Sequence, residues 1–252
     1  MDATKTKSRK RELTYGINPN NRSKISFDRS YGGLIFGNSG SGKTTVIRNE
    51  VSQILSLTKD AVVIISNSQD YYDLVAKFGG IVVDVSKSMD FDKNNRFVIL
   101  DISNMTDKIA AAKFCTDYIL ERSEKEQKHN LEHDSYLWGY FDGLDDYFYE
   151  EETADLLTAC KKQTLQYLTH LTFAFQDVMQ CLSTSQGRSI FNSTSFFIVL
   201  KQDSLISREQ LKIFWKLSDN QTESMNQNGA GIGLIYPLAL ASTAIPIQLD
   251  FS

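Results

Sequence analysis

The chain has little of what marks the specialised classes of protein. Its 252 residues include only three cysteines and three prolines. The apolar stretch Gly231 to Ile247, which holds no charged residue, is shorter than the roughly 20 residues that a membrane-spanning helix needs. Two prolines and a Ser-Thr pair interrupt this run, so we expect two late strands joined by a turn. Polar and basic residues follow Met1, so we expect no secretory signal.

The cysteines do not form a pattern. Cys115, Cys160 and Cys181 are far apart, odd in number and without the spacing of a metal site. This usage is typical of reduced thiols in an intracellular protein. We therefore expect a cytoplasmic protein, with any membrane contact made through partners.

Positive charge is also scarce. The net charge is −4, so the chain as a whole lacks the positive surface of DNA-binding proteins. The exception is the basic segment Lys5 to Arg11, which has no apolar periodicity. Two interpretations of it remain open: a solvated tail, or an arm that contacts nucleic acid or an anionic surface.

Apolar, strand-like runs alternate with amphipathic stretches along most of the chain. The continuous run Ala61 to Ser66 is typical of a strand buried on both faces. Such alternation predicts a mostly parallel sheet with helices on both faces. We expect a long helix from about Thr106 to Lys125, followed by a polar linker up to Asp134. Two late helices are expected to start at Ser207 and Ser218, where the residues fit a capping box.

One sequence motif indicates a ligand-binding site. The stretch GNSGSGKT, Gly37 to Thr44, matches the pattern G-x-x-x-x-G-K-[ST] in full. It lies between an apolar run and an amphipathic stretch, which is the strand–loop–helix context of a phosphate-binding loop. Glycines let backbone N–H groups turn toward phosphate oxygens, and the helix N-terminus adds partial positive charge. We predict a nucleoside triphosphate site made by Gly37, Asn38, Ser39, Gly40, Ser41, Gly42, Lys43, Thr44 and Thr45.

The motif also predicts roles and a fold. Lys43 would contact the β- and γ-phosphates, and the Thr44 hydroxyl would coordinate Mg²⁺. A second metal contact should be an aspartate at the end of a later apolar strand. Asp142 fits, and Asp101 is the rival. The predicted fold is an α/β P-loop NTPase (RecA-like) fold with a mostly parallel central sheet flanked by helices. Residues 1–22 would form a basic N-terminal segment and lead-in, and residues 23–252 the ATPase domain.

Other classes of P-loop protein lack support. The chain has no N-K-x-D guanine contact, no LSGGQ-like signature and no arginine-rich lid between the two nucleotide motifs. Instead it resembles the VirB-type conjugative-transfer ATPases of type IV secretion systems, in the HerA/FtsK clade, and above all those of Gram-positive mobile elements. The resemblance runs over most of the chain and rests on the order and spacing of the stretches YGINPNNRSKISFDRS, RFVILDIS, YFDGLDDYF, TFAFQDV, IFNSTSFFIVLKQDSLISREQL and GAGIGLI.

The resemblance carries expectations about the site and the partners. It implies ATP as the nucleotide, with Mg²⁺, and Gln176 as the residue that senses the γ-phosphate. Arg208 would be either a sensor arginine or an ordinary surface arginine at a helix start. A hexamer is implied, with other components of the secretion channel as partners and DNA as a further candidate. The protein would then lie at the inner face of the cell membrane.

The chain also departs from the family pattern. The family places a catalytic glutamate directly after the strand-end aspartate, where this chain has Gly143, and a glycine cannot activate water. Asp145 and Asp146 follow closely and are candidates to replace it. Lys161 and Lys162 stand where the family has an arginine-containing basic segment. Two functions therefore remain open: an ATPase motor domain, or a nucleotide-binding structural subunit that does not hydrolyse ATP.

Overall fold

The computed structural model describes residues 11–29, 31–87, 91–133, 135–227, 229–238, 241 and 243–250. Most of the basic segment noted in the sequence lies outside these residues. Arg11, its last residue, is described, and its guanidinium forms a buried ion pair with Asp60 at 2.7 Å.

Eleven strands and eight α-helices are formed by the described residues, together with a short 3-10 helix. The strands are β1 (Glu12–Ile17), β2 (Lys24–Asp28), β3 (Leu34–Phe36), β4 (Ala61–Ser66), β5 (Ile81–Asp84), β6 (Phe97–Asp101), β7 (Leu137–Asp142), β8 (Thr169–Phe175), β9 (Phe196–Val199), β10 (Ile232–Pro237) and β11 (Ile245–Leu249). The helices are α1 (Lys43–Leu57), α2 (Tyr72–Phe78), α3 (Lys108–His133), α4 (Glu151–Thr164), α5 (Val178–Ser183), α6 (Ser185–Asn192), α7 (Leu205–Trp215) and α8 (Asp219–Gln227), and the 3-10 helix is Asp145–Phe148.

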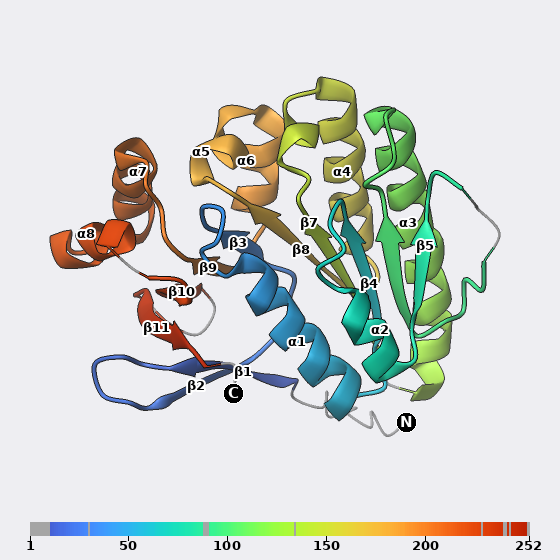
Figure 1. The fold of residues 1–252 in the computed structure, drawn as a ribbon, viewed down its shortest axis with the longest axis horizontal. Helices are drawn as coiled ribbons and strands as arrows, with labels where there is room; N and C mark the ends of the chain where they lie inside the picture. The colour runs from blue at the N-terminus through green and yellow to red at the C-terminus, as the bar shows by residue number, and fades with distance from the viewer. Residues whose placement is uncertain are drawn as a thin grey trace, which may run out of the picture.

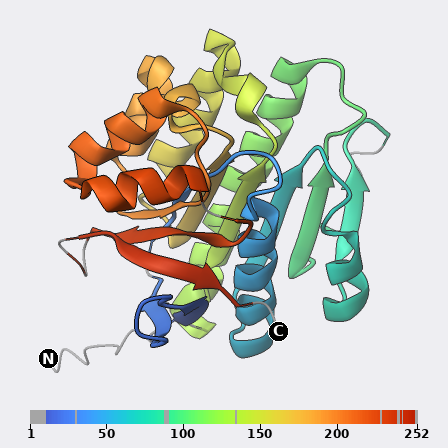
Figure 2. The same cartoon turned by 60° about the vertical axis from the view of Figure 1, so that its left-hand side comes forward.

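All eleven strands belong to one sheet, in the order β2-β1-β11-β10-β9-β3-β8-β7-β4-β6-β5. From β9 to β5 every neighbouring pair is parallel. The remaining strands, β10, β11, β1 and β2, extend the sheet in antiparallel pairs. Figure 2 shows β10 and β11 on the side of the molecule where α7 and α8 lie. The predicted α/β class with a mostly parallel central sheet is thus confirmed.

Helices cover both faces of the parallel part of the sheet (Figure 1). On one face α1 and α2 pack, with Val46, Ile47 and Leu74 in the same buried cluster as Val62 and Ile64 of β4. On the other face α3, α4, α5 and α6 join Val63 and Ile65 of the same strand. Successive side chains of a strand point to opposite faces, so a run that is apolar at every position serves both cores.

Buried ionic contacts tie the N-terminal hairpin β1–β2 to the parallel strands. Glu50 on α1 is fully buried and accepts hydrogen bonds from Tyr15 of β1 (2.6 Å) and Tyr140 of β7 (2.9 Å), and it pairs with Arg29 at 3.3 Å. A buried charge is tolerated only when partners replace its water. The hairpin therefore belongs to the same sheet, in which β1 pairs with both β2 and β11.

Two expectations about helices were wrong. The polar stretch expected to be a linker up to Asp134 is instead the second half of α3, which runs to His133. A solvated helix can be polar all round, so composition alone could not separate it from a linker. The first late helix, α7, starts at Leu205 rather than Ser207, because Ser204 provides the N-cap and accepts a bond from the Ser207 N–H. The start at Ser218 is confirmed by reciprocal bonds with Gln221.

Candidate nucleotide site

The motif loop joins β3 to α1 at the carboxyl edge of the parallel strands (Figure 1). Gly40 and Gly42 have φ values of 73° and 108°, which side chains disfavour. The helix α1 has no side-chain cap and no acidic residue in its first turn. Among the described residues, no hydrogen bond engages the N–H groups of Gly40, Gly42, Lys43 or Thr44. This group of free donors at a helix N-terminus is what an anion such as phosphate requires.

Neighbouring strands hold the loop in place. The Gly37 N–H donates to the Phe175 carbonyl of β8, and the Asn38 N–H donates to the Lys201 carbonyl beyond β9, both at 3.0 Å. The Ser41 carbonyl accepts a bond of 2.9 Å from the Gly231 N–H, ahead of β10. Three elements far apart in sequence therefore fix the loop, which reduces the cost of ordering it around a ligand.

Lys43 supplies the positive charge of the site. Its Nζ donates to the Gly37 carbonyl at 2.5 Å, so the side chain folds back over the loop. Partial burial lowers the pKa of Lys43, while the nearby Asp142 and Asp145 raise it. The ammonium group thus lies between the loop and two carboxylates, where it can contact phosphate oxygens.

Asp142 is the carboxylate that faces the loop. It ends β7, and its Oδ2 accepts bonds from the Thr44 hydroxyl at 3.2 Å and the Tyr71 hydroxyl at 2.5 Å. Mg²⁺ in nucleotide sites commonly takes one or two carboxylates or hydroxyls from the protein and completes its shell with phosphate and water. Thr44 and Asp142 fit this role. The described residues hold no cluster of three or more His, Cys, Asp or Glu arranged for a metal ion.

The rival aspartate lies elsewhere. Asp101 ends β6, and its carboxylate accepts bonds from the Ser103 N–H (2.8 Å) and the Tyr72 hydroxyl (2.5 Å). Asp142 is among the residues that line the cleft at the motif loop, whereas Asp101 is not. The geometry thus favours Asp142 as the second metal contact.

A side chain at position 143 would meet Asn67. The φ of Gly143 is +77°, and a Cβ built on it would lie 2.2 Å from Asn67 Oδ1. Asn67 follows β4, and its Nδ2 donates to the Gly143 carbonyl at 2.8 Å. A glutamate at position 143 would therefore have to displace Asn67 and adopt a left-handed backbone.

Asp145 is a second buried acid in the cleft. It opens the 3-10 helix, and its Oδ1 accepts a 2.7 Å bond from the Gln176 N–H at the end of β8. Burial raises the pKa of Asp145, while the Gln176 N–H and Lys43 lower it. Asp146, by contrast, is exposed. The sequence alone could not separate these two acids, because both follow the strand closely.

The remaining predicted residues fall into two groups. Gln176 is exposed and lines the cleft, together with Ser39, Gly40, Gly42 and Thr45. Arg208 does not line it, because its Nη1 donates to the carbonyls of Gln202 and Asp203 at 2.9 and 2.8 Å. Asn38 acts at the same place, with its Oδ1 accepting from the Asp203 N–H at 2.8 Å. Both therefore fix the segment after β9.

The basic residues at positions 161 and 162 do not form a positive patch. Lys161 is buried, and burial lowers its pKa to about 8. Lys162 is exposed at the end of α4. Only one of the two is therefore accessible to another molecule.

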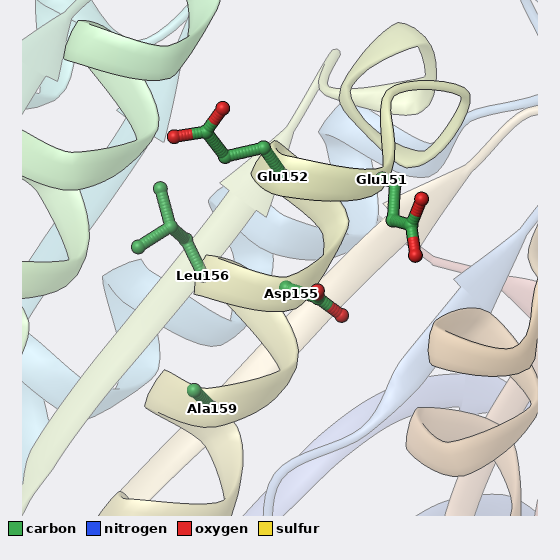
Figure 3. A pocket seen from close by; sticks show the side chains of 5 residues that line it. All are labelled: Glu151, Glu152, Asp155, Leu156 and Ala159. Atoms are coloured by element: carbon green, nitrogen blue, oxygen red, sulfur yellow. The ribbon is translucent and has the colours of Figure 1, made fainter.

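Two cavities compete as binding sites. The cleft at the motif loop has a volume of about 440 Å³ and contains Lys43 and Thr44 together with Asp142, Asp145 and Gln176. A groove of about 510 Å³ on α4 is lined by Glu151, Glu152, Asp155, Leu156 and Ala159 (Figure 3). The three carboxylates would repel a nucleotide. Glu151 and Glu152 lie in the first turn of α4, where their negative charge interacts favourably with the helix dipole. The cleft is the candidate site.

Solved structures share this arrangement of elements. VirB4 of Thermoanaerobacter pseudethanolicus superposes with a TM-score of 0.74 at 10% identity, over 95% of this chain and 96% of that one. The chain therefore shares its fold with this VirB4 structure. The cytoplasmic domain of the Thermomonospora curvata type VII secretion ATPase EccC gives 0.68 at 14%, over 96% and 26%. The conjugation coupling protein TcpA of pCW3, solved with ATPγS, gives 0.60 at 15%, over 100% and 69%.

The resemblance inferred from the sequence is thus confirmed at the level of the fold. Identities of 10–15% establish the fold alone, so activity has to be argued from the residues of the cleft. No family model and no curated protein sequence matches the chain. Within the described ranges, no helix is long and apolar enough to cross a membrane.

Sequence reasoning missed the importance of three side chains. Tyr71 bonds to Asp142, Asn67 fills the space beside Gly143, and the buried Gln202 donates to the Gln176 carbonyl at 3.2 Å. Their roles depend on the packing of segments that are distant in sequence.

Proposed function

We propose that the chain is the ATP-binding motor domain of a type IV secretion or conjugation system, and that it hydrolyses ATP to drive transfer of DNA or protein. The observation that carries this proposal is the cleft in which Lys43 and Thr44 face Asp142 from a loop with free N–H donors. The VirB4 fold, which extends over 95% of the chain, supports the assignment to this kind of machine.

The cleft residues have distinct roles in this proposal. The loop N–H groups and Lys43 bind the phosphates, and Thr44 and Asp142 hold Mg²⁺. When bound, the metal ion neutralises charge on the phosphate oxygens. Binding and orientation account for most of the catalysis in phosphoryl transfer, so these residues would contribute the largest share.

We assign Asp145 as the residue that orients the attacking water and accepts its proton. A water oxygen attacks the γ-phosphorus, the bond to the β-phosphate oxygen breaks, and ADP leaves with that electron pair while the water proton passes to the carboxylate. The Gln176 N–H fixes one oxygen of Asp145 at 2.7 Å, which leaves the other to orient water. Burial raises the pKa of Asp145, which makes its carboxylate a better proton acceptor than an exposed aspartate. Gln176 itself, at the end of β8, would contact the γ-phosphate.

The alternative function is a nucleotide-binding structural subunit of the same machinery. The residue at position 143 favours it, since a glycine stands where the family has its catalytic glutamate and cannot activate water. In this case ATP would set the conformation or assembly of the subunit, and turnover would be negligible.

Phosphate release and nucleotide binding separate the two functions. We would measure both for the wild type and for Lys43→Ala, Asp145→Asn and Asp146→Asn. A motor domain predicts turnover that Lys43→Ala abolishes and Asp145→Asn lowers by about 10²-fold, the usual contribution of general-base catalysis. Asp146→Asn is the matched control, because Asp146 is exposed, and its turnover should remain within about twofold of the wild type.

The same experiment has a clear negative outcome. Tight ATP binding with no phosphate release above that of Lys43→Ala would reject the motor function and support the structural subunit. Equal turnover in Asp145→Asn and Asp146→Asn would reject the role assigned to Asp145 while leaving the motor function intact.

Partners and location follow from the same proposal. We infer a homo-oligomer, a hexamer in the first instance, that works with other components of the secretion channel and with DNA. It would lie in the cytoplasm at the inner face of the membrane, with residues 23–252 as the ATPase domain and β1 as a strand added to its sheet. Sedimentation with and without ATP tests the oligomer, and a monomer under both conditions would contradict it.

A further inference from the structure

Tyr71 makes an unusual contact with the proposed metal site. It caps the start of α2 and is completely buried, and its hydroxyl donates to Asp142 Oδ2 at 2.5 Å. The same oxygen accepts the Thr44 hydroxyl at 3.2 Å. Among the described residues, no donor is bonded to the other oxygen, Oδ1. One oxygen of the carboxylate is therefore held from the protein side, and the other is free.

Tyr71 acts through Asp142 and not on a ligand directly. Asp142 lines the cleft, whereas Tyr71 does not. The Tyr71 ring lies in the core beside α1 and α2, in the same cluster as Val46 and Leu74. A buried phenol needs a hydrogen-bond partner, and here that partner is the strand-end carboxylate of the cleft. Side chains that bond to metal-ligating carboxylates fix the orientation of those ligands.

The next residue provides an internal comparison. Tyr72 donates to Asp101 Oδ2, also at 2.5 Å. Asp101 ends the strand β6 and is buried like Asp142, but it does not line the cleft. Two consecutive tyrosines thus make the same bond to two strand-end aspartates, one inside the proposed site and one outside it.

We propose that Tyr71 is a positioning residue for the divalent cation: its hydroxyl holds Asp142 Oδ2 so that Oδ1 faces the cleft. This inference rests on the proposed function, because it assumes that a metal–nucleotide complex binds there. A merely structural role would consist of filling the core and satisfying one hydroxyl. Removing the hydroxyl would then affect stability but leave the affinity for the metal unchanged.

The test compares Tyr71→Phe with Tyr72→Phe. The protein is saturated with a non-hydrolysable fluorescent ATP analogue, and Mn²⁺ is titrated and followed by its paramagnetic resonance signal. We expect the apparent Mn²⁺ affinity to fall about tenfold in Tyr71→Phe, the lower end of the usual effect of such partners. We expect Tyr72→Phe to match the wild type. Nucleotide affinity in excess chelator should be the same in all three proteins.

A second measurement keeps the test decisive. Thermal unfolding without nucleotide shows whether both variants fold. Because Tyr71 and Asp142 act through one bond, adding Tyr71→Phe to Asp142→Asn should cause no further loss of Mn²⁺ affinity. A further tenfold loss in the double variant would overturn the inference.

The outcomes distinguish the inference from the proposed function. Equal Mn²⁺ affinity in Tyr71→Phe and Tyr72→Phe, with normal Mn²⁺-dependent nucleotide binding in the wild type, would overturn the role of Tyr71 alone. A wild type that binds no nucleotide, with or without Mn²⁺, would overturn the proposed function and with it this inference.

Discussion

Asp142 and Asp101 are closely similar in local structure and differ in what surrounds them. Both end buried parallel strands, and both pair in register with Ser66 of β4, which lies between their strands. Both carboxylates accept a 2.5 Å bond from one of two consecutive tyrosines. Only Asp142 meets the Thr44 hydroxyl, whereas Asp101 accepts the N–H of Ser103, two residues further along its own chain.

The difference comes from the lateral position in the sheet. The strand of the motif loop, β3, is separated from β7 by β8 alone, whereas β8, β7 and β4 stand between it and β6. Neighbouring strands are about 4.8 Å apart, so Asp101 is roughly 10 Å further away from the loop than Asp142. A local pattern of an apolar run ending in aspartate is therefore not sufficient for a metal contact. The order of strands decides which aspartate reaches the loop.

The largest expected effect separates the two aspartates directly. Asp142→Asn should weaken Mg²⁺-dependent nucleotide binding by at least about 10-fold to 100-fold, because it removes the charge that faces the metal. Asp101→Asn should leave that binding unchanged, since its carboxylate bonds only to its own neighbourhood. Titration of Mg²⁺ in the presence of a fluorescent ATP analogue measures both. Equal losses in the two variants would contradict the assignment of the metal site.

A smaller effect is expected at the glycine that follows Asp142. Gly143 and Gly79 have similar φ values, +77° and +73°, but an added Cβ meets Asn67 at Gly143 and nothing within 4 Å at Gly79. Gly79→Ala should cost about 1 kcal/mol of unfolding free energy for the left-handed backbone. Gly143→Ala should cost about 2 kcal/mol, because Asn67 must also move and lose its bond to the Gly143 carbonyl. Urea denaturation measures both.

A third substitution checks the cause of that difference. Asn67→Ala removes the side chain in the way, so in that background Gly143→Ala should cost no more than Gly79→Ala. If Gly143→Ala still cost more unfolding free energy than Gly79→Ala in that background, the strain at Gly143 would lie in the backbone rather than in the contact with Asn67.

An effect that appears only at acidic pH concerns the far end of β8, the strand beside β7. His170, near the start of β8, is buried against Trp138 and Tyr136, and burial lowers its pKa to about 3. The unfolded chain takes up a proton near pH 6.5, whereas the folded chain does not. Stability should therefore fall as the pH drops below about 6.5, by about 2 kcal/mol at pH 5. Denaturation at pH 7.5 and pH 5 measures this loss.

The control for this pH dependence is His170→Phe, which keeps the aromatic contact and cannot take up a proton. In this variant the unfolding free energy should fall much less between pH 7.5 and pH 5 than it does in the wild type. A decline as steep as that of the wild type would assign the pH dependence to other groups.

Predictions from the sequence are most reliable where the chemistry is local. The loop Gly37–Thr44 could be predicted because its glycines, lysine and threonine act within one stretch, and the buried strand β4 because it is apolar at every position. The second half of α3 could not, because a polar helix and a polar linker have similar composition. Strand β1 was hard to predict because it is held in the sheet partly by a buried network. In that network Tyr15 and Arg29 both contact Glu50, which is distant in sequence.

By itself, then, the sequence determined the α/β class, and it predicted the phosphate-binding loop and a short set of candidate acids. Only the tertiary structure decided among those acids, bringing Asp142 and Asp145 into the cleft and leaving Asp101 outside it. It also brought Tyr71 to Asp142 across 71 residues of chain and Asn67 to Gly143 across 76. The physical reason is that a loop's phosphate contacts depend on nearby residues, whereas a carboxylate's partners depend on the order in which strands pair.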